Sequence, residues 1–304
     1  MIVDDQHCWW AVARSEELKS DRPIGITCAG HAIALWREPD GTARAVEDRC
    51  PHRRVPVSLG CILPDGRLRC GYHGWTFDGA TGHLQEIPNL PDQKRFPPHY
   101  GLRTYSVHEE AGLVRVALKG EIPFTGAASE LLPLSGTVAL TIDHAQYVRA
   151  FLDAPELVIT VPGVELTKYL ARDPQEQGGR LIMERSCRWR GMHWPARISA
   201  EFELNLWTAT DPITGETEIK LYNLEFTPLL TARLVPVPAI RNGTTVRWRA
   251  QSCARGLYGL RTRRQPILIH DHIEAAQLMA VLPSASIEFD KVRMGMRNAQ
   301  VAAA

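Results

Sequence analysis

The chain has 304 residues, which is enough for two domains of ordinary size, each with its own hydrophobic core. Its 35 basic residues nearly balance its 34 acidic residues, so the formal net charge of +1 gives no electrostatic attraction to nucleic acid or to an anionic membrane. The N-terminus lacks the layout of a signal peptide, and no uncharged apolar run reaches the roughly 18 residues that a membrane span needs. We therefore expect a cytoplasmic protein whose partners are small molecules or other proteins.

Residues 1–118 read as short strands separated by turns. The runs HAIALWRE and ARAVED flank the turn sequence PDGT, and WTFDGATGHLQEI contains a second turn between two short strands. Gly, Pro and Asp at such positions are typical of β-hairpins. We predict an all-β domain over these residues.

Within this half, four potential metal ligands form two pairs. Cys50 and His52 have the spacing C-x-H, whereas Cys70 and His73 have the spacing C-x-x-H, and Pro or Gly residues beside each pair are typical of loops. Thiolate and imidazole ligands suit a tetrahedral zinc ion. They equally suit a 2Fe-2S cluster with two cysteines on one iron and two histidines on the other. The spacing alone leaves both cofactors open.

The second half has a different pattern. Residues 119–135 contain Gly, Pro and Ser without a sustained hydrophobic period, which predicts a linker. Residues 136–304 contain strand-like runs at 179–190, 196–210, 218–229 and 244–253. The segment HDHIEAAQLMAVL (270–282) then changes to helical spacing. We predict an antiparallel sheet closed by this helix, so that the whole chain has an α+β fold.

The motif CPHRRVPVSLG (50–60), followed by CGYHGWTFD (70–78), resembles the Rieske motif of Rieske-type non-haem iron oxygenases. The segments CWWAVARSEEL, IALWREPDG, EIPNLPD and YGLRTYSVHEEAGLVRV fit the same domain in order, and Arg54 departs from the family at a position where Gly is usual. The resemblance implies a 2Fe-2S cluster, bound by Cys50 and Cys70 on one iron and by His52 and His73 on the other. It also implies that residues 136–304 form a helix-grip (START/Bet v 1-like) domain.

Members of this family also bind a mononuclear non-haem Fe(II) through two histidines and one carboxylate. The segment LIHDHIEAAQ (268–277) resembles the part that supplies the carboxylate, and it puts Asp271 at the ligand position. Asp271 and Glu274 also have the spacing of a helix capping box, which is the structural alternative.

The two histidine ligands are missing at their expected places. In the segment AQYVRAFLDAPELVITVPG, Glu156 takes the place of the first histidine and Val161 that of the second, and valine cannot coordinate a metal. This iron is therefore doubtful. A rearranged site that combines Glu156 and Asp271 with His270 or His272 is the alternative.

Asp153 matches a family aspartate that links a cluster histidine of one subunit to the iron site of the next, so the resemblance implies a bridging role in electron transfer. A plain aspartate beside a turn, before Pro155, is the alternative reading.

Together these features predict a subunit that receives electrons from a reductase or ferredoxin and passes them to the iron of a neighbouring, related subunit. The resemblance implies a homotrimer or a mixed hexamer that hydroxylates or demethylates a small organic molecule. The alternatives are a self-sufficient oxygenase subunit with an unorthodox mononuclear iron site, and a zinc-binding module without catalysis.

Overall fold

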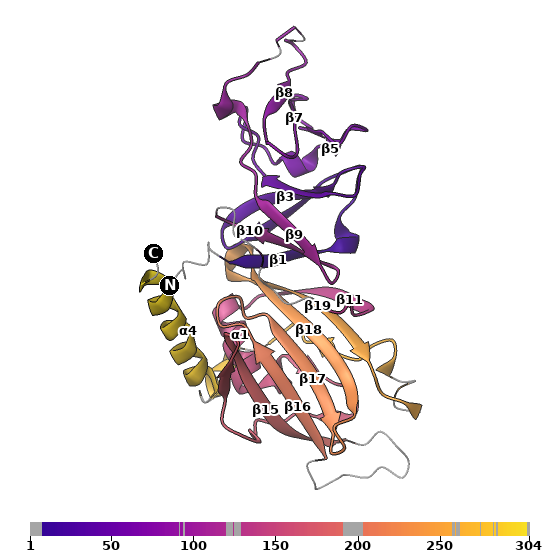
Figure 1. The fold of residues 1–304 in the computed structure, drawn as a ribbon, viewed down its shortest axis with the longest axis vertical. Coiled ribbons are helices and arrows are strands. Elements are labelled where there is room, and N and C mark those ends of the chain that lie inside the picture. The colour runs from indigo at the N-terminus through magenta and orange to yellow at the C-terminus, as the bar shows by residue number, and fades with distance from the viewer. Residues whose placement is uncertain are drawn as a thin grey trace. The chain divides into compact units, whose positions relative to one another are not determined.

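The computed structural model describes residues 8–90, 92–93, 95–119, 124, 129–190, 203–256, 259, 262–273, 275–281, 283 and 285–302. The chain divides into two compact units, Met1–Leu131 and Leu132–Ala304, which we call the N-terminal unit and the C-terminal unit. Sheets dominate both units, and the predicted α+β fold is confirmed (Figure 1). Within the described ranges, no helix has the length and apolar character needed to cross a lipid bilayer.

Three small antiparallel sheets build the N-terminal unit, with the strand orders β1-β10-β9, β2-β3-β4 and β5-β6-β7-β8. The strands are β1 Trp9–Arg14, β2 Ile24–Cys28, β3 His31–Arg37, β4 Ala43–Glu47, β5 Cys61–Ile62, β6 Leu68–Arg69, β7 Thr76–Phe77, β8 Leu84–Glu86, β9 Ser106–Glu110 and β10 Leu113–Ala117. Both predicted hairpins form, as β3–β4 and β7–β8. In the first, the Asp40 carboxylate accepts a hydrogen bond from Thr42 N at 2.8 Å, which closes the turn.

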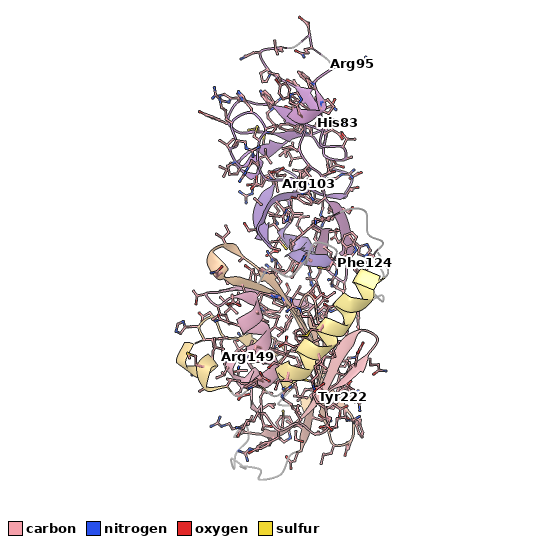
Figure 2. All side chains as sticks on the ribbon, turned by 90° about the vertical axis from the view of Figure 1, so that its left-hand side faces the viewer. His83, Arg95, Arg103, Phe124, Arg149 and Tyr222 are labelled. Atoms are coloured by element: carbon pink, nitrogen blue, oxygen red, sulfur yellow. The ribbon has the colours of Figure 1, made fainter. Side chains whose placement is uncertain are left out.

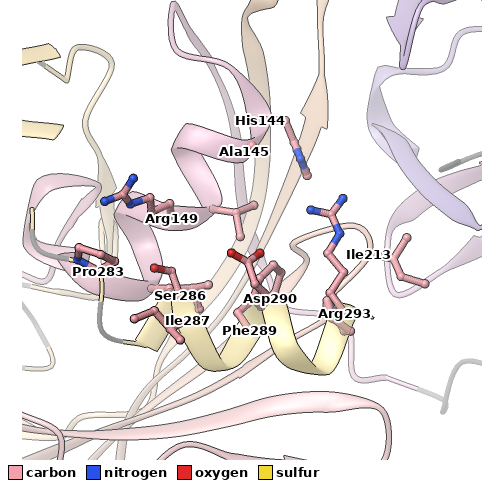
Figure 3. A pocket seen from close by; sticks show the side chains of 13 residues that line it. His144, Ala145, Arg149, Ile213, Pro283, Ser286, Ile287, Phe289, Asp290 and Arg293 are labelled. Atoms are coloured by element: carbon pink, nitrogen blue, oxygen red, sulfur yellow. The ribbon is translucent and has the colours of Figure 1, made fainter. Parts of the chain in front are cut away.

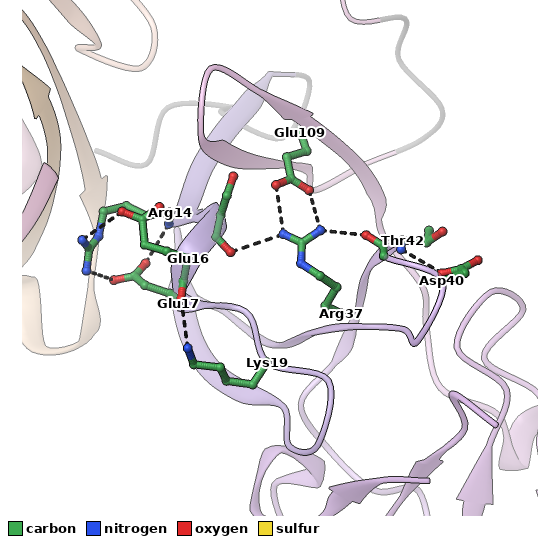
Figure 4. A network of polar contacts seen from close by, with 10 residues as sticks. Arg14, Glu16, Glu17, Lys19, Arg37, Asp40, Thr42 and Glu109 are labelled. Carbon is green, nitrogen blue, oxygen red and sulfur yellow. Dashed lines mark hydrogen bonds and ion pairs between the residues drawn. The ribbon is translucent and has the colours of Figure 1, made fainter. Parts of the chain in front are cut away.

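Polar contacts tie these sheets together. Arg37 of β3 donates from Nη1 and Nη2 to the two carboxylate oxygens of Glu109 of β9, each at 2.9 Å, in a bidentate pair (Figure 4). Arg103, labelled in Figure 2, donates to the carbonyl of Leu118. Its guanidinium carbon lies 5.0 Å from the centroid of the Tyr105 ring. The adjoining hydrophobic cluster includes Trp36, Val57, Leu68, Trp75 and Phe77 together with the two cysteines Cys50 and Cys70. The predicted ligand loops therefore rest directly on a core.

An eight-stranded antiparallel sheet dominates the C-terminal unit, with the order β11-β19-β18-β17-β16-β15-β13 and with β14 paired to β15. Its strands are β11 Leu134–Leu140, β13 Val164–Glu165, β14 Gln175–Gln177, β15 Arg180–Trp189, β16 Leu204–Thr210, β17 Thr217–Asn223, β18 Pro228–Pro238 and β19 Thr244–Ser252. A separate pair joins β12 (Ile159–Thr160) to β20 (Leu268–Ile269). The helices are α1 His144–Asp153, α3 Ala275–Ala280 and α4 Ala285–Ala302. Helix α1 contacts both β18 and α4, and its apolar residues share one core with those of the sheet.

The helix predicted at 270–282 is shorter than expected. Directly before this segment, strand β20 pairs with β12, and His270 N donates to Val158 O at 2.9 Å. Residues 270–273 are therefore not helical. The helix α3 begins at Ala275, and Pro283 follows it, where proline disfavours helical backbone in the preceding residue. The longer helix α4 was not predicted.

Candidate metal centre

Two loops with the same backbone hydrogen bonds carry the predicted ligands. In each loop the cysteine N–H donates to the carbonyl five residues later, and the cysteine carbonyl accepts from the N–H four residues later, at 2.8–3.1 Å. The N–H donors of these second bonds, Arg54 and Gly74, occupy equivalent positions and have left-handed backbone, with φ of 62° and 70°. Glycine adopts this conformation with the least strain, which explains why Gly is usual at the position of Arg54.

The loops present two thiols inward and two imidazoles outward. Cys50 and Cys70 are each 2% exposed, whereas His52 and His73 are exposed and their ring centroids lie 4.7 Å apart. Burial raises the pKa of the Cys50 thiol to about 11, so a thiolate at neutral pH needs a bound cation to stabilise it.

The four side chains form a thiol pair and an imidazole pair. Across the part of the chain that the structure describes, no three His, Cys, Asp or Glu side chains gather as ligands of a single ion. A 2Fe-2S cluster with mixed ligands needs two thiolates on one iron and two imidazoles on the other. This donor set fits such a cluster.

Aromatic rings orient both imidazoles. Trp75 stacks on His52 with a centroid distance of 4.8 Å and planes only 2° apart, and Tyr72 lies 3.9 Å from His73. Trp75 is 9% exposed and belongs to the hydrophobic cluster of the N-terminal unit. The core therefore holds the His52 ring from one face while its edge stays accessible.

The two loops approach each other closely. The 3₁₀ helix Val57–Leu59 follows the first loop, and a Cβ atom at Gly60 would lie 2.0 Å from the carbonyl oxygen of Arg69, which precedes the second. Asp48 stabilises this helix, because Ser58 donates from N and Oγ to its carboxylate at 2.7 Å and 2.6 Å. Protein contacts thus bring the two ligand pairs together.

In the C-terminal unit, the segments of the other predicted ligands are neighbours. The β12–β20 pairing sets residues 270–271 beside the turn that contains Glu156, and Glu156 and Asp271 are both exposed. His270, however, already uses both ring nitrogens. Its Nδ1 lies 2.9 Å from Leu157 O and its Nε2 lies 2.8 Å from Thr160 Oγ1. Glu274, the other half of the capping-box alternative, lies outside the described residues.

The remaining position of the expected iron site is apolar. Val161 is 1% exposed and belongs to the hydrophobic core of the C-terminal unit. A facial triad requires two imidazoles and one carboxylate with open coordination positions between them. The described residues at these positions therefore do not form a facial triad.

Asp153 connects two helices. Its side chain is fully buried at the end of α1, and its two oxygens accept hydrogen bonds from Ser286 N at 3.0 Å and from Ser286 Oγ at 2.6 Å, in the first turn of α4. Ser286 also lines a pocket of about 240 Å³ between these helices, together with His144, Asp290 and Arg293 (Figure 3). The geometry gives Asp153 a structural role within its own chain.

Arg185 was not among the predicted site residues. This residue is 1% exposed, although it lies on β15 in the row that otherwise faces the core with Leu181, Met183 and Cys187. It donates to the carbonyl of Leu152 in α1, and burial lowers the pKa of its guanidinium despite the nearby charge of Glu156. A single charged residue at the apolar positions of an alternating strand was the pattern that could have revealed it.

Comparison with known proteins agrees with the N-terminal site. A family model described as "Rieske [2Fe-2S] domain" matches residues 8–105. The protein TIC 55, chloroplastic, of Arabidopsis thaliana is 32% identical over 171 residues, which cover 52% of this chain and 31% of that protein. The oxygenase component of dicamba O-demethylase from Stenotrophomonas maltophilia is 38% identical over 109 residues, which cover 36% of this chain and 31% of that protein. The matched part thus spans about a third of the length of these curated relatives.

Solved structures extend the likeness to the whole fold. A crystal structure of dicamba monooxygenase with non-heme iron and dicamba has a TM-score of 0.67, covers 99% of both chains and is 17% identical. At this identity the comparison establishes a shared fold.

Proposed function

This chain is a Rieske-domain protein whose relatives and structural neighbours are Rieske non-haem iron oxygenases, and we propose that it is the electron-carrying subunit of a multicomponent oxygenase system. Its electrons come from a reductase or ferredoxin and pass to a mononuclear iron on a neighbouring, related subunit. The system hydroxylates or demethylates a small organic molecule, and two relatives bear the name O-demethylase. The proposal includes a homotrimer or mixed hexamer and a cytoplasmic location.

One observation carries this proposal, namely the buried thiol pair beside an exposed imidazole pair. When bound, a 2Fe-2S cluster supplies one-electron transfer at a potential above that of all-cysteine clusters. Cys50 and Cys70 would hold one iron, and His52 and His73 the other. The exposed imidazoles can then meet a protein partner, while Cys50 and Cys70 remain shielded from water.

The acceptor is assigned to another subunit because, among the described residues, the two positions where the family has histidine ligands are occupied by Glu156 and Val161. Val161 is buried among apolar side chains, and the ring nitrogens of His270 already have hydrogen-bond partners. The second candidate function is a self-sufficient oxygenase subunit that binds iron through Glu156 and Asp271. The neighbouring position of their two segments favours it.

The test is a count of iron and acid-labile sulfide in the anaerobically purified chain, alone and after co-expression with a related oxygenase subunit. Equal amounts of iron and sulfide support the electron-carrying subunit. An excess of about one iron per cluster in the chain alone supports the second candidate. Zinc without sulfide contradicts both and leaves a zinc-binding module.

A further inference from the structure

The two cluster loops differ in charge, although their backbone hydrogen bonds are alike. Arg49, Arg53 and Arg54 are all exposed on or directly beside the loop that contains His52. Among the described residues, none of these three guanidinium groups has a carboxylate within ion-pairing distance. The nearest carboxylate in sequence, Asp48, is hydrogen-bonded to Ser58.

The loop that contains His73 has no charged residue, and Arg69, directly before it, is half-buried with its Nε donating to Thr76 Oγ1 at 3.5 Å. Gly71 and Tyr72 precede the histidine, and Tyr72 is 62% exposed. Leu59 lies beside this loop, because a Cβ atom added at Gly71 would be 2.7 Å from the carbonyl oxygen of Leu59. Leu59 is 76% exposed. The exposed arginines therefore belong to the His52 loop, whereas the His73 loop has a neutral, partly apolar surface, although the two imidazole centroids lie only 4.7 Å apart.

Three exposed arginines within six residues, with no ion-pair partner among the described residues, produce a local positive potential, even though the whole chain is nearly neutral. Such a patch raises the association rate of a partner of opposite charge and orients it on arrival. We propose that the surface formed by Arg49, Arg53 and Arg54 is the docking site of an acidic one-electron donor protein, and that electrons enter through His52. The inference rests on the proposed function, because it assumes that His52 is a cluster ligand.

The proposed reaction transfers one electron and no atoms. One electron leaves the reduced centre of the donor, which is oxidised by one electron, and the 2Fe-2S cluster is reduced by one electron. No bond is formed or broken. The protein contributes the docking charge, the exposed edge of His52 and the stacking of Trp75, which keeps that edge in place.

The experiment measures the second-order rate constant for reduction of the cluster by a reduced, acidic plant-type [2Fe-2S] ferredoxin in a stopped-flow instrument at several ionic strengths. We expect the triple variant R49Q/R53Q/R54Q to react on the order of 10-fold to 100-fold more slowly at low salt and to lose most of the salt dependence. The lysine triple R49K/R53K/R54K keeps the charge and should retain most of the rate.

The matched control is R255Q/R263Q/R264Q, which removes three exposed arginines from the C-terminal unit and should leave the rate within about twofold. Photoreduced 5-deazaflavin, a small uncharged reductant, should reduce all variants equally. If the glutamine triple loses its cluster, the single variants R49Q and R53Q replace it, each with an expected loss of about threefold.

A wild-type rate in the glutamine triple, or in both single glutamine variants where the triple loses its cluster, would overturn the docking site and leave the proposed function intact. An equal loss of rate in the control triple would do the same. Absence of acid-labile sulfide from the wild-type chain would overturn both, because the donor would then have nothing to reduce.

Discussion

Cys70 is the residue on which the ligand assignment is easiest to test. It is buried, and its loop repeats the hydrogen bonds of the Cys50 loop. Because two thiolates are needed on one iron, we expect Cys70→Ser to abolish the visible absorption of the cluster. The control is Cys61→Ser, at an exposed cysteine on β5, which should keep full absorption. Unchanged absorption in the Cys70 variant would contradict the assignment.

Asp153 is expected to act mainly by anchoring α4. Asp153→Asn replaces one acceptor oxygen by a donor that faces the hydroxyl and N–H of Ser286. We expect the free energy of unfolding to fall by about 1–3 kcal/mol, measured by urea denaturation. Asp290→Asn, at an exposed position of α4, should change it by about 0.5 kcal/mol or less. Equal stability of both variants would remove the anchoring role and leave the bridging role to be considered.

His144 predicts a pH dependence of stability. Burial lowers its pKa below the ordinary value of 6.5, and Arg293 acts in the same direction, whereas Asp143 and the carbonyl of Thr214 oppose the shift. The unfolded chain then binds a proton that the folded chain excludes. The contribution of neutral His144 to the free energy of unfolding is complete above pH 6.5. It is lost as the pH falls from 6.5 toward the lowered pKa of His144 in the folded chain.

The check is urea denaturation between pH 8 and about pH 5. The stability difference between the wild type and His144→Gln should shrink as the pH falls, because glutamine can still donate to Thr214 O but does not titrate. A difference that stays constant with pH would contradict the prediction.

At the scale of elements, the contact between the two cluster loops depends on the missing side chain of Gly60. A Cβ atom there would meet Arg69 O at 2.0 Å, and neither backbone can move without shifting a cysteine loop. We expect Gly60→Ala to separate the loops and to lower the cluster content below half of the wild-type value, measured as sulfide per chain. Gly30→Ala is the control, since no atom lies within 4 Å of its added Cβ and only its φ of 82° adds strain. A normal sulfide content in Gly60→Ala would show that the loops can adapt.

Several elements were predictable because their cause is local. The β3–β4 and β7–β8 hairpins follow from Asp, Gly and Thr in short turns. The predicted run at 218–229 covers most of β17 and only the first two residues of β18, so the rest of β18, which contains Pro236 and Pro238, was not predicted. Both prolines lie beyond Leu234, the last residue of β18 that pairs with β17. Their missing N–H groups therefore interrupt no hydrogen bond between β18 and β17.

At the scale of the whole molecule, each unit has its own hydrophobic core. We therefore expect Leu206→Ala, at a fully buried position of the C-terminal unit, to destabilise that unit by about 2–5 kcal/mol without changing the temperature at which the cluster absorption bleaches. Leu68→Ala, fully buried in the N-terminal unit, should lower the bleaching temperature instead. If either variant shifts both transitions together, the two units unfold as one.

The sequence by itself determined the α+β fold class and the two Cys/His pairs, because turn chemistry and ligand type depend only on neighbouring residues. Tertiary structure alone decided the rest. Asp153 acquires its partner Ser286 from 133 positions away, and Arg185 reaches the helix α1 across the sheet. The predicted helix begins later than expected because β20, directly before it, pairs with β12 and His270 N donates to Val158 O. In each case the stabilising partner is distant in sequence, so local propensity and spacing contain no information about it.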